Sequence, residues 1–134
     1  MPWYGYIHPL VAIGTLGLGF VTGQTSLSKM TEWDFPLRKQ RTRSIFFFLL
    51  TVLNFVLGMV VMTALRGGGS KMKLTGHMPL AIAMMVLAML AALVTFTRGR
   101  AGEVSGAMRL HPLLIIAALA LIFTNGFLTI LAVL

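Results

Sequence analysis

Residues 44–65 read SIFFFLLTVLNFVLGMVVMTAL, a run of 22 residues without a charged side chain. A bilayer has a hydrocarbon core about 30 Å thick, which an α-helix of about 20 apolar residues crosses. Three further apolar runs cover about residues 6–24, 77–97 and 110–133. Each run is expected to be helical, because an unpaired backbone N–H or C=O finds no water inside the membrane. The sequence therefore predicts an all-α fold, an integral membrane four-helix bundle that forms a single domain over residues 1–134.

The composition favours this class and excludes several others. Hydrophobic residues make up 57% of the chain and charged residues 10%, whereas about 25% charged residues is usual for a soluble domain. The chain has no cysteine, which excludes disulfides, thiolate metal sites and thioether attachment of haem. The net charge of +8 comes from lysines and arginines, which in membrane proteins usually lie in loops that face anionic lipid. We therefore expect the lipid bilayer as a partner and no nucleic acid.

The basic residues also indicate how the spans are oriented, because loops rich in lysine and arginine tend to face the cytoplasm. The first and third predicted loops carry most of these residues, namely Lys29, Arg38, Lys39, Arg41 and Arg43 in the first and Arg98, Arg100 and Arg109 in the third. The second loop carries Arg66, Lys71 and Lys73. We therefore expect both termini on the non-cytoplasmic side of a bacterial inner membrane or a thylakoid-type membrane.

Three histidines open predicted spans, and each is followed closely by a proline: His8-Pro9, His77-Met78-Pro79 and His111-Pro112. A proline at the first helical position is an ordinary helix start, so each motif also has a purely structural interpretation. In an antiparallel bundle the first and third spans begin on the same side. His8 and His77 therefore lie at similar depth, and His111 lies on the opposite side. Two imidazoles inside a helix bundle are suited to be axial haem ligands, so we predict that His8 and His77 bind the iron of one haem b between the first and third helices.

Other polar residues narrow the chemistry around this predicted site. Arg66, Lys71 and Lys73 lie in the loop nearest to it and are expected to bind the haem propionates. Asn54 and Asn125 are expected to form hydrogen bonds between helices. No acidic residue lies within a span, which argues against a carboxylate proton relay, and we find no nucleophile–base pair. An electron carrier or oxidoreductase subunit is therefore favoured over a hydrolase or transferase.

The motifs that open the spans resemble those of small four-helix proteins related to cytochrome b561 and the ferric reductases. His8-Pro9 enters the first span, Gly76-His77 the third, and Arg109-Leu110-His111 the fourth. The resemblance covers nearly the whole chain and implies one haem between helices one and three and a second between helices two and four. His8 and His77 match the first pair of ligands, and His111 matches one ligand of the second pair. The start of the second helix, residues 38–44, contains no histidine, so the second haem of this architecture lacks a ligand. One haem is favoured; the alternatives are that His111 holds a five-coordinate haem or another pigment, or that a partner subunit supplies the missing ligand.

Three functional hypotheses follow. The first is a b-type haem electron-transfer protein, alone or as the membrane subunit of a larger redox complex, with a quinone as a possible partner. The second is a non-catalytic small subunit of a photosynthetic or respiratory complex, whose histidines bind a chlorophyll-type pigment or only lie at the interface. The third is a lipid-surface scaffold that acts through Arg38, Lys39 and Arg41.

Overall fold

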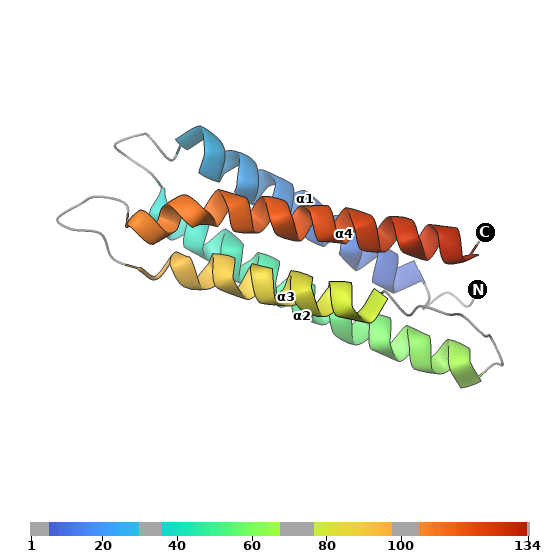
Figure 1. Ribbon diagram of the computed structural model, residues 1–134. Coiled ribbons are helices and arrows are strands. Elements are labelled where there is room, and N and C mark those ends of the chain that lie inside the picture. Colours follow the sequence, from blue (N-terminus) through green and yellow to red (C-terminus); the bar gives the residue numbers. More distant parts are fainter. Residues whose placement is uncertain (1–5, 30–35, 68–76, 98–104, 134) are drawn as a thin grey trace.

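The structure is a computed structural model that describes residues 6–29, 36–67, 77–97 and 105–133. It contains four α-helices: α1 (Ile7–Lys29), α2 (Leu37–Gly67), α3 (His77–Val94) and α4 (His111–Val133). A short 3-10 helix, η2 (Gly106–Leu110), leads into α4. The helices lie side by side and alternate in direction, so that α1 and α3 begin at one end of the bundle (Figure 1). We call this the His8 end, and the opposite end, where α2 and α4 begin, the His111 end. The predicted all-α four-helix bundle is confirmed.

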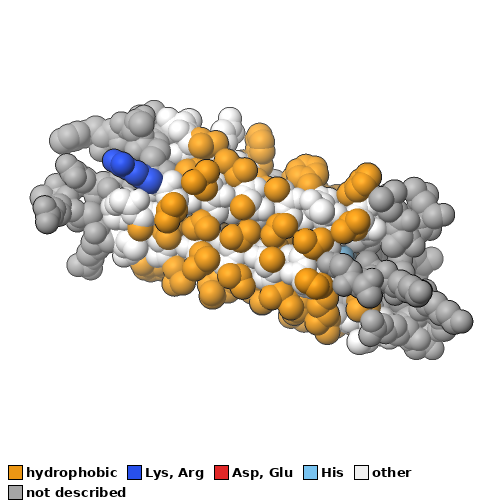
Figure 2. All heavy atoms as spheres, viewed as in Figure 1, with side chains coloured by type: hydrophobic (Ala, Val, Ile, Leu, Met, Phe, Trp, Pro, Cys, Tyr) orange, Lys and Arg blue, Asp and Glu red, His pale blue; other side chains and the backbone are white. Residues whose placement is uncertain are grey.

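The surface of the bundle has the character of a membrane protein. All four helices are long and apolar enough to cross a bilayer. Large hydrophobic side chains are exposed along them, including Phe20, Leu49 and Phe123, and hydrophobic side chains are spread along the described surface in view (Figure 2). Conversely, the interior holds buried hydroxyl groups, such as those of Thr15 and Thr51, which bond to carbonyls of their own helices. This distribution, apolar outside and partly polar inside, suits a protein surrounded by lipid.

The packing places α1 and α3 on one diagonal of the bundle and α2 and α4 on the other. Each of α1 and α3 packs against both α2 and α4. The core between them consists of Phe47, Met84, Ala88, Ala91, Ile115, Ala118 and Ile122. Gly19 leaves room for the ring of Phe47, because a Cβ atom at this position would lie 2.6 Å from that ring. Small side chains at such positions let neighbouring helices approach closely.

The helix α2 begins at Leu37, seven residues before the predicted start of the second span at Ser44. Its charged first turns remain helical because their side chains bond to the ends of the neighbouring helices. The Nε and Nη2 atoms of Arg41 donate to the carbonyl of Thr95, just beyond α3, at 3.1 and 2.8 Å. Nη1 of Arg43 donates to the hydroxyl of Thr25 in the last turns of α1 at 3.0 Å. Arginines at helix C-termini also interact favourably with the helix dipole. Arg41 and Arg43, which were predicted to lie in a loop, therefore bond α2 to the ends of α3 and α1.

The other helix ends lie closer to the predicted spans. The helix α1 continues to Lys29, five residues past the predicted end at 24. The helix α3 begins at His77, as predicted, and ends at Val94, three residues before 97. The helix α4 begins at His111, after the 3-10 turn of η2.

Candidate functional site

His8 lies in the first turn of α1, and its orientation is fixed by α2. Its Nδ1 is 3.1 Å from the backbone carbonyl of Asn54. A carbonyl only accepts hydrogen bonds, so Nδ1 carries the hydrogen and Nε2 of the neutral ring keeps its lone pair. Gly58, one turn beyond Asn54, makes this approach possible, because a Cβ atom there would lie 3.0 Å from Cε1 of His8. The ring is therefore held in the tautomer that can bind a metal through Nε2.

His77, the first residue of α3, is held in the same way by α4. Its Nδ1 is 3.2 Å from the hydroxyl of Thr129. That hydroxyl donates its own hydrogen to the carbonyl of Asn125 at 2.8 Å, so it can only accept from His77. Nδ1 of His77 therefore also carries the hydrogen, and its Nε2 keeps a lone pair. The side chain of Asn125 also approaches the His77 ring, and no hydrogen bond to Nε2 of His8 is found among the described residues.

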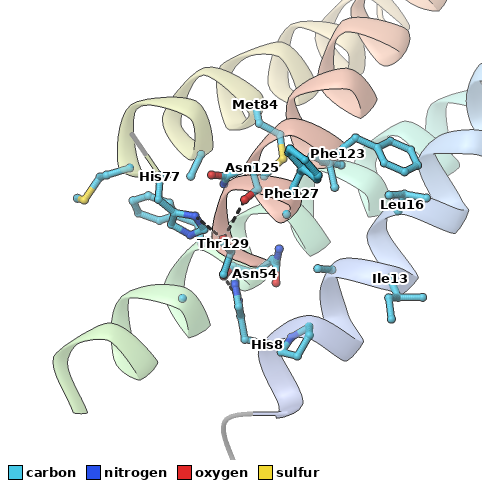
Figure 3. A pocket seen from close by; sticks show the side chains of 18 of the residues that line it. His8, Ile13, Leu16, Asn54, His77, Met84, Phe123, Asn125, Phe127 and Thr129 are labelled. Atoms are coloured by element: carbon cyan, nitrogen blue, oxygen red, sulfur yellow. Dashed lines mark hydrogen bonds between the residues drawn. The ribbon is translucent and has the colours of Figure 1, made fainter. Parts of the chain in front are cut away.

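The two imidazoles lie close together across the bundle. Their ring centroids are 6.4 Å apart, and the ring planes are inclined by 66°. Figure 3 shows the rings approaching from α1 and α3, with Thr129 of α4 beside them. The structure thus brings together two histidines that are separated by most of the first two helices in the sequence.

A cavity of about 470 Å³ adjoins both rings, within the usual range for small-molecule sites. Its walls come from all four helices and are mainly apolar, including Ile13, Leu16, Met62, Met84, Phe123 and Phe127. Asn54 and Asn125 also line it. The side-chain oxygen of each is buried and has no hydrogen-bond partner within the described part of the chain. An apolar cavity with a few polar groups and two imidazoles is typical of a cofactor site.

The separation of the two rings is compatible with a shared metal ion. A metal-bound imidazole nitrogen lies about 2.0 Å from the metal, so two ligands on opposite sides place their ring centroids about 6 Å apart. The observed 6.4 Å agrees with this separation. Rings that share one metal–nitrogen axis can be rotated about it, so the angle of 66° is compatible with shared ligation. Metal-ligating histidines almost always donate their other N–H to a carbonyl, carboxylate or water, and here the acceptors are a carbonyl and a hydroxyl.

His111 lies at the other end of the bundle, and both of its ring nitrogens are already bonded. Nε2 is 2.7 Å from the hydroxyl of Ser44 on α2, and Nδ1 is 2.8 Å from that of Ser26 on α1. The hydroxyl of Ser44 donates to the carbonyl of Gln40 at 2.8 Å, so it accepts from Nε2. In the neutral ring Nδ1 then accepts from Ser26. The ring is completely buried, and these bonds join α1, α2 and α4.

The remaining predicted ligands are not described. Lys71 and Lys73 lie outside the described residues, as does the side chain of Arg66, so the prediction that they bind propionates stays a prediction. Sequence reasoning missed Thr129 and the acceptor role of the Asn54 carbonyl. The only sequence signal for the latter is Gly58, which follows Asn54 by one helical turn.

No family model, curated protein or solved structure matches the chain. The likeness to the cytochrome b561 and ferric-reductase group therefore stays a prediction from the motifs of the spans. The geometry of the histidine pair and its cavity is therefore the basis for a functional proposal.

Proposed function

We propose that the chain is a b-type haem membrane protein that transfers electrons, with His8 and His77 as the axial ligands of one haem. The observation that carries this proposal is the histidine pair itself. Each ring is held at Nδ1 by a neighbouring helix, and each keeps a lone pair at Nε2. The ring separation of 6.4 Å suits one shared ion.

The residues of the chain would orient the haem and set its surroundings. When bound, the haem iron supplies one-electron oxidation and reduction, which is the chemistry of a carrier rather than of a hydrolase. The Asn54 carbonyl and the Thr129 hydroxyl fix the two rings and increase their basicity as ligands. The walls of the cavity are mainly apolar, and apolar surroundings are one of the means by which a protein tunes a haem potential.

The wider setting follows from the charge pattern. Basic residues at the His111 end support a cytoplasmic location for that end and a non-cytoplasmic location for the His8 end and both termini. Electrons would pass between a quinone and a carrier on the non-cytoplasmic side, with the chain acting alone or as the membrane subunit of a larger redox complex.

The test is the absorption spectrum of the protein purified in detergent from cells supplied with haem precursor. We expect a Soret band and reduced b-type bands. His8→Ala and His77→Ala should lose these bands. His77→Met offers a matched variant, because methionine can also be an axial haem ligand and raises the potential. We expect this variant to keep haem with a more positive midpoint potential.

Three results would overturn the proposal. One is a purified protein without haem that does not take up added haemin. Another is a chlorophyll-type spectrum, which would favour a pigment-binding subunit of a photosynthetic complex. The third is a bound divalent ion without porphyrin, detected by elemental analysis.

A further inference from the structure

We infer that His111 has a structural role and joins α1, α2 and α4 by hydrogen bonds at its end of the bundle. The chain then holds one haem and exchanges electrons only through the His8 end. This inference rests on the proposed function, because it concerns the same haem. The family resemblance implies a second haem between the second and fourth helices, with His111 as one ligand. The contacts of His111 disagree with that expectation.

Neither ring nitrogen of His111 has a free lone pair for a metal. A histidine binds a metal through a nitrogen that has a free lone pair. Nε2 of His111 carries a hydrogen and donates it to Ser44, while Nδ1 accepts from Ser26. Ligation would break at least one of these bonds, and each joins α4 to a different helix. Because the ring is completely buried, a released hydroxyl would find no water to replace its partner.

The space between His111 and α2 is also too small for a metal ion. Two ligand atoms on opposite sides of one metal ion are about 4 Å apart, since each lies about 2 Å from the metal. On α2 the residue that faces His111 is Ser44, and its Oγ lies only 2.7 Å from Nε2. There is no room for an ion between these atoms, and less for a porphyrin. By contrast, His8 and His77 are separated by a distance that fits an ion and adjoin a large cavity.

The third observation concerns the interior between the two ends. Ser26 follows His8 by eighteen positions on α1, a rise of about 27 Å. The histidines of the chain are His8, His77 and His111, so no further histidine ligand for a haem lies between the two ends. Electron transfer weakens steeply with distance, so donors and acceptors must approach the haem from the His8 end.

Haem stoichiometry tests the first half of the inference. We expect one haem per chain from iron content and the pyridine haemochrome. Ser44→Ala and Ser26→Ala should lower the melting temperature but leave the haem count, the absorption bands and the electron paramagnetic resonance of the ferric haem unchanged. His111→Ala should behave in the same way if it folds, and the serine variants provide the test if it does not. A count of two, or loss of haem in a serine variant, would overturn this inference alone, whereas a count of zero would overturn the proposed function.

The side of the membrane from which the haem can be reduced tests whether electrons pass only through the His8 end. The chain has no cysteine, so Tyr6→Cys and Leu110→Cys, at exposed positions of the His8 and His111 ends, mark the two faces. Each variant is placed in vesicles at less than one protein per vesicle and labelled from outside with an impermeant maleimide. Dithionite added outside should reduce the same fraction of haem as the fraction of Tyr6→Cys that is labelled. The test is decisive when Tyr6→Cys and Leu110→Cys are labelled to different extents. If the fraction of reduced haem then equals the labelled fraction of Leu110→Cys, haem is not reached only from the His8 end.

Discussion

Replacing Thr129 by valine gives the most direct test of how His77 is oriented. Valine has nearly the shape of threonine but lacks the hydroxyl, so Nδ1 of His77 loses its acceptor while the packing is kept. Removing a group that orients a metal-ligating histidine usually weakens metal binding by about 10–100-fold, which corresponds to about 1.4–2.7 kcal/mol. The bond here is 3.2 Å long, at the upper end of the usual range for N–H···O bonds. We therefore expect an effect of about tenfold.

The assay is a titration of haem-free protein in detergent with haemin, followed at the Soret band. The matched control is Thr124→Val, the same substitution on the same helix. The hydroxyl of Thr124 is exposed and bonds only to its own helix, at the Ala120 carbonyl. This control should change haem affinity by no more than about 0.5 kcal/mol. If Thr129→Val and the wild-type protein bind haemin with equal affinity, and both are folded by circular dichroism, Thr129 does not orient a haem ligand and the reasoning is refuted.

Four other substitutions test the structure at separate points. Gly58→Ala brings a methyl carbon to 3.0 Å from Cε1 of His8, so the ring must shift; we expect a cost of about 1 kcal/mol, roughly a fivefold loss of affinity in the haemin titration. Gly19→Val inserts a side chain against the ring of Phe47 and should destabilise the bundle by about 1–3 kcal/mol in thermal unfolding. Gly14→Val, whose added carbon meets no atom within 4 Å, should change stability by less than about 0.5 kcal/mol. Asn125→Leu removes a buried amide oxygen without a described partner and should stabilise the haem-free protein by about 1 kcal/mol, measured by the same unfolding; a less stable variant would show that this oxygen is satisfied.

The four-helix bundle could be predicted because each apolar run is close to or above the length needed to cross a bilayer. The start of α2 could not be predicted in the same way. Arg41 and Arg43 look like loop residues because charge normally indicates water, yet both lie in a helix that continues past the apolar run. Their acceptors, Thr95 and Thr25, are distant in the sequence, so only the fold shows why these turns remain helical.

The candidate site was partly predictable for a similar reason. Histidines are rare in spans and easy to identify, and the alternating direction of the helices places His8 and His77 at one end. The partners that hold them are harder to identify. The acceptor for His8 is a backbone carbonyl, which every residue possesses. The partners of His111 are serines 85 and 67 positions away, and serines carry no signal that separates this role from ordinary packing.

The unequal lengths of α2 and α3 have a consequence for the membrane itself. The helix α3 has 18 residues, a rise of about 27 Å, whereas α2 has 31, about 46 Å. A long span can tilt or extend among the headgroups, but a short one makes the surrounding bilayer thinner. His77 begins the short helix, so a thicker bilayer draws it below the level of the headgroups and a thinner bilayer brings it to the boundary. We therefore expect lipid composition to change how readily water reaches the two imidazoles.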